Sequence, residues 1–160
     1  MRALVMSDIH GDEFILRWML EQAWKFVGPV DAYICLGDGA SEFQRLENFI
    51  RRRDENAVMY CVRGNCDLAV GDMPDRMIVS LGGAKVMLTH GHMYRVKFGL
   101  DILRKAAQEA GCSVVLYGHT HRADIDASGP LMVNPGAAKD CHMALLAISD
   151  GKPLAKLLDF

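Results

Sequence analysis

The feature that most constrains this chain is a series of five short apolar runs, each followed by a turn that carries Asp, Asn or His. The runs cover residues 3–6, 32–36, 57–62, 85–88 and 113–117. Apolar runs of this length, closed by glycine-containing turns, are typical of buried β-strands. The groups that follow them are Asp8-Ile9-His10-Gly11, Gly37-Asp38, Gly64-Asn65-Cys66-Asp67, Thr89-His90-Gly91-His92 and Gly118-His119-Thr120-His121. Ligands of open α/β sheets bind at the carboxyl ends of strands, so the sequence predicts a site where these groups meet.

Helical patterns separate the first three of these strands. Apolar residues at helical spacing predict a helix over residues 12–26, which Gly28-Pro29 ends. A second helix is expected to begin at Ser41, because Ser41-x-x-Gln44 matches the capping-box pattern. A third is expected over about residues 99–110, with Gly111 as its C-cap. Strands that alternate with helices predict parallel βαβ units.

The later part of the chain predicts three hairpins. Residues 77–81 would pair with 85–88, residues 123–126 with 131–134, and residues 143–149 with 154–158. The last pair is joined by Asp150-Gly151, a favoured hairpin turn. Parallel units followed by hairpins predict an α/β fold in which two mixed sheets pack together with helices outside. A length of 160 residues favours one domain over residues 1–160.

The net charge and the cysteines limit which partners and which cellular compartment we expect. A formal net charge of -2 gives no electrostatic reason to expect a nucleic acid or an anionic membrane surface as a partner. No apolar run approaches the length of a membrane span. The amino terminus runs straight into the first strand, so we expect no cleaved signal peptide. Five cysteines without a CxxC pair are typical of buried thiols in a reducing compartment, so we expect a cytoplasmic protein.

The residue types at the strand ends are those of a metal centre. In extended backbone, side chains at i and i+2 point to the same side, so Asp8 and His10 are expected to reach one metal together. His119 and His121 repeat this spacing and could serve one metal or two neighbours. Asp38 stands alone, and a lone carboxylate can bridge two metals. The amide oxygen of Asn65 and the imidazole of His90 complete a set of seven ligands, which is too many for one ion and suits two. Nitrogen and oxygen donors without thiolate favour Mn, Fe, Zn, Co or Mg over a structural zinc site.

Each of these elements is weak evidence by itself. A lone histidine at a strand end is usually a hydrogen-bonded structural residue, and a Gly-Asn pair usually marks a turn. The evidence lies in five groups that occur in one order, each at the end of a predicted strand.

The ordered set DxHG, GD, GNxD, a histidine in THGH, and GHTH resembles the signature of the calcineurin-like metallophosphoesterases. The resemblance covers residues 6–136, and the small size and the variant GNCD resemble the short bacterial and archaeal phosphodiesterase branch. It implies a four-layer α/β/β/α sandwich and a phosphodiesterase that acts on a small-molecule diester through a hydroxide shared by two metals. It also implies Mn²⁺ as the usual metal, with Ni²⁺, Zn²⁺, Fe²⁺, Co²⁺ or Mg²⁺ as alternatives. By matching position, one metal would take Asp8, His10, Asp38 and His121, and the other Asp38, Asn65, His90 and His119.

The chain departs from this pattern at Cys66. Many members of the family have at this position a histidine that protonates the leaving oxygen. A thiol with an ordinary pKa near 8.5 can donate a proton in principle, but a small spacer is the favoured interpretation of Cys66. His92 is the other candidate acid, or a contact for phosphate. Asn65 would orient a phosphate oxygen as well as bind metal, so the catalytic candidates are Asn65, Cys66 and His92.

Other functions fit the sequence less well. The small retromer subunit resembles the same fold and uses it for protein contacts, so a scaffold with little or no catalysis is the alternative; a scaffold can lose ligands freely, and this chain retains all seven. A nuclease is disfavoured by the acidic balance and the short chain. Trp24 and Phe26, near the end of the first predicted helix, suggest an exposed patch and a homodimer contact. The sequence does not name the natural substrate.

Overall fold

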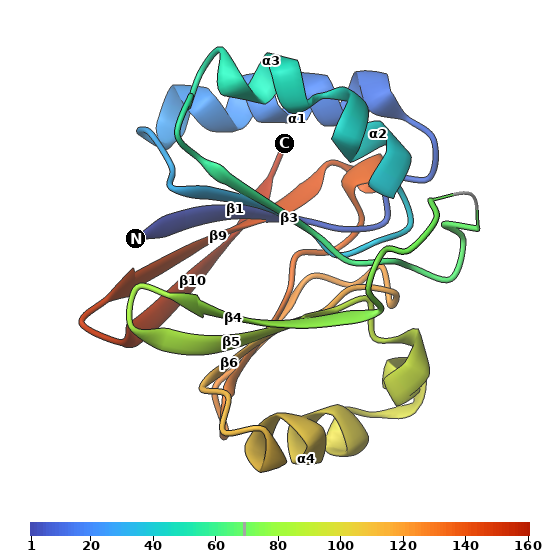
Figure 1. Cartoon of the computed structure of the whole chain (residues 1–160), viewed down its shortest axis with the longest axis vertical. Helices are drawn as coiled ribbons and strands as arrows, with labels where there is room; N and C mark the ends of the chain where they lie inside the picture. The colour runs from blue at the N-terminus through green and yellow to red at the C-terminus, as the bar shows by residue number, and fades with distance from the viewer. Residues whose placement is uncertain (69) are drawn as a thin grey trace.

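The computed structural model describes residues 1–68 and 70–160, which form two five-stranded mixed sheets between layers of helix (Figure 1). The first sheet has the order β10 (Lys152–Asp159), β9 (His142–Ser149), β1 (Arg2–Met6), β2 (Ala32–Cys35), β3 (Val58–Cys61). The second has the order β4 (Arg76–Leu81), β5 (Ala84–Thr89), β6 (Val114–Leu116), β8 (Leu131–Asn134), β7 (Asp124–Asp126).

Each sheet contains three neighbouring parallel strands, and the predicted site groups follow five of these six strands. β1, β2 and β3 are parallel, with Met6 opposite Cys35 and Cys35 opposite Cys61. In the second sheet β5, β6 and β8 are parallel, with Leu88 opposite Leu116. The three predicted hairpins are confirmed as β4–β5, β7–β8 and β9–β10.

Helices cover the outer face of each sheet, which gives the predicted four layers (Figure 1). The helices over the first sheet are α1 (Glu13–Phe26), α2 (Ala40–Arg45) and α3 (Glu47–Arg51), and α4 (Asp101–Glu109) covers the second. Three short 3₁₀ turns complete the fold: η1 (His92–Tyr94), η2 (Val96–Phe98) and η3 (Ala138–Asp140). Within the described residues, no helix has the length and apolar character needed to cross a membrane.

Alternation along the central strands explains why their sequences are apolar throughout. On β1, Leu4 and Met6 pack in the cluster beneath α1, while Ala3 and Val5 pack in the cluster between the two sheets. A strand that is buried on both faces needs an unbroken apolar run rather than alternating polar residues. Met87 of β5 faces a third cluster, beneath α4.

Two local predictions are corrected. The expected single helix from Ser41 is two short helices, and its N-cap is Gly39 rather than Ser41. Gly39 has φ +149°, and a Cβ there would overlap the side chain of Ile9, so this cap position requires glycine. The Ser41 hydroxyl donates instead to its neighbour Glu42 at 3.0 Å.

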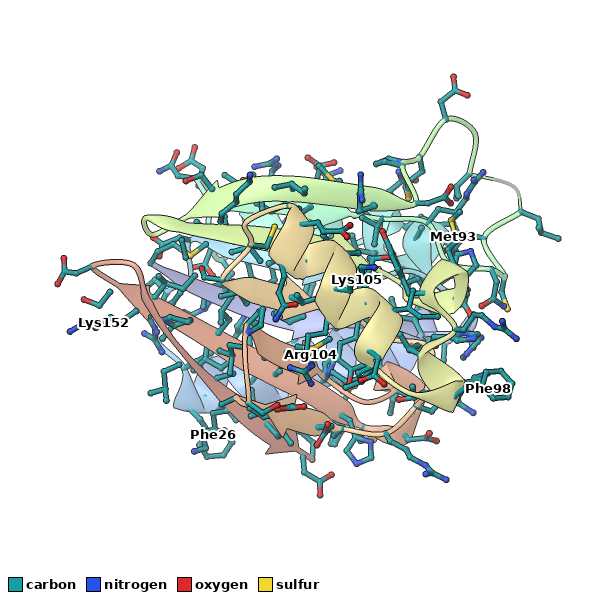
Figure 2. The ribbon with its side chains drawn as sticks, turned by 90° about the horizontal axis from the view of Figure 1, so that it is seen from below. Phe26, Met93, Phe98, Arg104, Lys105 and Lys152 are labelled. Carbon is teal, nitrogen blue, oxygen red and sulfur yellow. The ribbon has the colours of Figure 1, made fainter. Side chains whose placement is uncertain are left out.

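The aromatic patch at the end of α1 is smaller than expected. Phe26 is 80% exposed, and Figure 2 shows it at the edge of the molecule. Trp24 instead packs against the core beneath the helices, and its indole nitrogen donates to the Tyr33 hydroxyl at 2.8 Å. The predicted patch therefore holds for Phe26 alone.

Candidate metal centre

Asp8, His10 and His121 form one cluster of donor atoms. His121 Nε2 lies 3.1 Å from Asp8 Oδ1, and His10 Nε2 lies 3.7 Å from the same oxygen. The two Nε2 atoms of His10 and His121 face each other at 3.1 Å. Two ligands of one transition-metal ion lie about 3 Å apart, so these spacings suit a shared cation.

Asp38, His90 and His119 form a second cluster next to the first. His90 Nε2 lies 3.4 Å from Asp38 Oδ2 and 3.2 Å from His119 Nδ1. Asp38 also faces the first cluster, because its Oδ2 lies 4.0 Å from His10 Nε2. One carboxylate thus stands between the two groups of donors.

The backbone that presents these side chains is left-handed rather than extended. The residues concerned are Asp8 (φ +56°), His10 (+51°), Asp38 (+54°), His119 (+69°) and His121 (+58°). The expectation that residues i and i+2 meet because the chain is extended is therefore wrong, although the side chains do converge. Asp and His occur in this region more often than other residues, but each such residue costs of order 1–2 kcal/mol.

Hydrogen bonds from the rest of the fold hold this strained backbone. The Asp8 N–H donates to Gly37 O at 3.0 Å and the His10 N–H to Asp38 O at 2.9 Å, so the first two site loops brace each other. Asp8 Oδ2 accepts from the backbone N–H of His119 at 3.0 Å, which ties the first sheet to the second.

The donor atoms fit a cation rather than a network of hydrogen bonds. Asp8 Oδ1 is fully buried and accepts no hydrogen bond within the described residues. An unsatisfied buried carboxylate oxygen is costly unless a cation or a donor reaches it. His90 Nδ1 must donate to the carbonyl of Leu36, 2.8 Å away, because a carbonyl only accepts. When the ring is neutral, as a metal ligand must be, this bond leaves the lone pair of His90 on Nε2, which faces the cluster.

The pKa values of these groups follow from burial and from each other's charges. Burial alone would raise the pKa of Asp38, but hydrogen bonds from His90 and from the Cys66 N–H hold it well below its usual range. Burial opposes the charged form of His90, yet Asp38 and Asp8 raise its pKa. Burial, together with the positive charges of His90 and Lys97, lowers the pKa of His119 to about 4.

The three candidate catalytic residues lie at the rim of the two clusters. Asn65 is exposed, and its amide nitrogen donates to Cys66 Sγ at 3.2 Å. Cys66 is exposed and forms a third group of donor atoms with His10 and Asp38. The His92 ring lies 5.5 Å from that of His90 and 6.2 Å from that of His119, centre to centre. Burial and the charge of His90 lower the pKa of His92, so its neutral form predominates.

Asp67 organises the centre without being part of it. Its carboxylate accepts four backbone N–H bonds, from Asp38 (2.7 Å), Gly39 (2.9 Å), Ala40 (3.0 Å) and Gly64 (2.8 Å). Asp67 is the last residue of the GNxD motif. Three of the four amides belong to the Asp38 loop and to the start of α2, and the fourth is that of Gly64, the first residue of the motif.

Asn134 supports the other side of the centre and was missed as a site residue. Its amide nitrogen donates to Gly118 O and Thr120 Oγ1, both at 3.0 Å, and its Oδ1 accepts from the Gly136 N–H. The loop that carries His119 and His121 is thereby fixed to the end of β8. The available signal in the sequence was an asparagine between an apolar run and Pro135-Gly136; the structure shows that this asparagine is fully buried.

Comparison with known proteins identifies the family. Residues 1–151 match the calcineurin-like phosphoesterase superfamily domain, and the chain belongs to this family of metal-dependent phosphoesterases. A relative, the probable metallophosphoesterase YsnB of Bacillus subtilis, is 35% identical over 140 residues, which cover 87% of this chain and 76% of YsnB.

Solved structures agree with this assignment. A conserved protein of Streptococcus pneumoniae, described as a predicted phosphoesterase, superposes with a TM-score of 0.75 at 31% identity, covering 99% of this chain and 88% of its own. An archaeal phosphodiesterase has a TM-score of 0.73 at 23% identity, over 99% of this chain and 100% of its own. Vps29 of Entamoeba histolytica, solved with Zn²⁺, has a TM-score of 0.71 at 20% identity, over 99% of both chains. The last two likenesses show the shared fold.

Proposed function

We propose that this chain is a metal-dependent phosphodiesterase that hydrolyses a small organic phosphodiester at a centre of two divalent ions. The observation that carries the proposal is the pair of adjacent donor clusters that share Asp38, beside a buried oxygen of Asp8 that no hydrogen bond satisfies. One ion would be held by Asp8, His10, Asp38 and His121, and the other by Asp38, Asn65, His90 and His119. The family resemblance favours Mn²⁺, and nitrogen and oxygen donors of this kind also allow Ni²⁺, Zn²⁺, Fe²⁺, Co²⁺ or Mg²⁺.

The chemistry is divided between the ions and the chain. Two divalent ions supply an activated water and positive charge that stabilises the phosphoryl oxygens. Asn65 lies at the rim, where its amide can orient a phosphate oxygen. His92 keeps one N–H in its neutral form and lies beside the second cluster, where it can donate to the substrate. Cys66 N–H holds Asp38 Oδ1 at 2.7 Å, so the backbone of residue 66 positions Asp38 whatever its side chain does.

A diester is the favoured substrate because an archaeal phosphodiesterase shares the whole fold. The alternative is a protein-interaction scaffold, as the likeness to Vps29 indicates. A fold alone does not decide function, but six clustered donors and an unsatisfied buried carboxylate oxygen favour the enzyme. We place the activity in the cytoplasm, because all five cysteines are free thiols.

The test is hydrolysis of bis-p-nitrophenyl phosphate against p-nitrophenyl phosphate, with each divalent metal or with chelator. We expect faster diester turnover that requires metal and is abolished in Asp38→Ala. Asp72→Ala, which removes an exposed carboxylate from the neighbouring segment, is the control and should retain activity. No turnover with any metal, in protein shown by circular dichroism to be folded, would reject the enzyme and favour the scaffold.

A further inference from the structure

A surface pocket borders the loop that carries His119 and His121. Its lining includes Thr120, the residue between these two histidines, so the pocket adjoins the metal centre directly. Its volume is about 600 Å³, within the range of small-molecule sites. The pocket is formed by the η2 segment, the residue before α4, and the chain from Tyr117 to Asp124.

The walls of this pocket combine an apolar surface with two cations. Val96, Leu100, Ala123 and the buried ring of Tyr117 provide the apolar part. Lys97 and Arg122 bring positive charge from two separate segments, and Asp124 brings one carboxylate, so the charged residues of the lining are positive on balance. Such walls suit a ring or short apolar group that carries an anion.

The two cations have no carboxylate partner within the described residues. Some other arginines are paired, as Arg63 is with Asp75 at 2.8 Å and Arg104 with Asp126. Within the described residues, no carboxylate lies within 4.0 Å of the charged atoms of Lys97 or Arg122. Two like charges that line one pocket repel each other, and a bound anion would relieve this repulsion.

The pocket adjoins both donor clusters. Thr120 lines the pocket and stands between His119 and His121, which belong to the two clusters. The position is suited to a substrate group attached to a phosphate at that centre.

A second pocket at the same centre has the opposite character. It has a volume of about 300 Å³, and the charged residues in its lining include Asp38, Glu42 and Asp67 but no Lys or Arg. Asp38 belongs to the metal site, but no Lys or Arg of this pocket could bind an additional negative charge on a substrate, whereas Lys97 and Arg122 can. The two pockets thus distinguish the two arms of a diester.

We propose that the pocket beside Thr120 binds the arm of a phosphodiester substrate that carries a second negative charge on an aromatic or apolar group, with Lys97 and Arg122 as its anion contacts. This deepens the proposed function and rests on it, because the scissile phosphate is taken to lie at the metal centre. The proposed substrates are therefore organic phosphodiesters that carry a second negative charge on one ester group, rather than diesters whose two ester groups are both uncharged.

The experiment compares two diesters that differ by one charge: p-nitrophenyl 4-carboxyphenyl phosphate and p-nitrophenyl phenyl phosphate. Both release p-nitrophenol, so the leaving group is constant. The test variant is Lys97→Gln with Arg122→Gln. The matched control is Lys105→Gln with Lys152→Gln, which removes the same charge from α4 and from the start of β10 (Figure 2). A second readout is calorimetric binding of 4-carboxyphenyl phosphate against phenyl phosphate, which needs no turnover.

We expect the wild type to prefer the carboxylated diester about tenfold in KM and the carboxylated phosphate about tenfold in Kd, as a charge-assisted contact provides. The test variant should lose both preferences and keep its activity on p-nitrophenyl phenyl phosphate. The control variant should keep both preferences and this activity. Equal KM and Kd for the two ligand pairs in the wild type, or an unchanged preference in the test variant, would overturn the proposal. Hydrolysis of the neutral diester reports the proposed function separately: it persists if only the anion pocket is wrong, and it is absent from the wild type if the enzyme itself is wrong.

Discussion

The carboxylate of Asp67 and the backbone N–H of Asp38 are joined by a 2.7 Å hydrogen bond in the buried interior of the site. The same carboxylate takes three further amide bonds, so one side chain sets the path of the chain around the carboxylate shared by the two clusters. Its role is to position Asp38, and it does not belong to either cluster.

Asp67→Asn should therefore cost both stability and activity. The amide group would turn an NH₂ towards two N–H donors and lose the negative charge, at a cost of about 2–4 kcal/mol in the free energy of unfolding. Urea unfolding measures this loss, and Asp72→Asn at an exposed position is the matched control. Equal stability of the two variants would contradict the role given to Asp67.

Asn134→Ala should weaken metal binding more than it weakens the fold. It removes the N–H donors that hold Gly118 O and Thr120 Oγ1, and these bonds fix the orientation of His119 and His121. Loss of a residue that orients ligands typically costs 10- to 100-fold in metal affinity. Calorimetric titration with Mn²⁺ measures the affinity, and a wild-type value in folded Asn134→Ala would show that the loop is held by other contacts.

Gly118→Ala should be among the most damaging small changes in the chain. A Cβ at this position would overlap Ser7 Oγ and come within 2.9 Å of Asp8 Oδ2, and both neighbours are fully buried. We expect a loss of about 3 kcal/mol or more, because a packed interior cannot move aside. Gly129→Ala meets the end of the Arg104 side chain instead and serves as the control in thermal unfolding.

The metal-free protein should be most stable near pH 6.5. His119 has its pKa lowered to about 4, so it stays neutral in the fold while the unfolded chain binds a proton below about 6.5. Stability is therefore lost as the pH falls from about 6.5 to about 4. The raised pKa of His90 acts the other way, since its contribution is present below about 6.5 and is lost as the pH rises through the raised value.

The acid side of this profile is the sharper test. In chelator, the slope of unfolding free energy against pH between about 4 and 6.5 should fall by up to about one bound proton in His119→Asn. Urea unfolding at several pH values measures the slope. An unchanged slope would mean that protonation of His119 does not cause the loss of stability at acid pH.

Cys66 predicts which leaving groups the enzyme tolerates. A phenolate leaves without help, whereas an alkoxide needs a proton, and a thiol hydrogen-bonded to Asp38, which raises its pKa, donates poorly. Wild-type protein should hydrolyse bis-p-nitrophenyl phosphate well and diethyl phosphate poorly. Cys66→His should raise ethanol release at least tenfold, and an unchanged or lower rate would count against this view of Cys66.

The layers of the fold could be predicted because the hydrophobic pattern specifies them. β1 is apolar on both faces, and the hairpins carry turn residues such as Asp150-Gly151, so local patterns and the final packing agree. The break between α2 and α3 could not be predicted, because the same apolar stripe fits one helix or two. Trp24 was assigned to the surface, since its hydrogen bond to Tyr33 depends on a strand that follows it in the chain.

At the site, residue types could be predicted but backbone geometry could not. The sequence gathers Asp8, His10, Asp38, His90, His119 and His121 at strand ends, and the structure brings them together. Their left-handed φ values depend on bonds between loops, such as the one from His10 N–H to Asp38 O. Asn134 is linked to the centre through Gly118 and Thr120, a contact between strand ends that no local motif records.

The division of the donors between two sheets limits how this protein can respond to a ligand. Asp8, His10 and Asp38 come from the first sheet, and His90, His119 and His121 from the second, while tightly packed aliphatic side chains fill the space between. A clamshell movement of one half against the other would open that interior and separate the donors at once. The two sheets therefore form a rigid support for the donors, and the loops at the edge of the site select which ligands reach them.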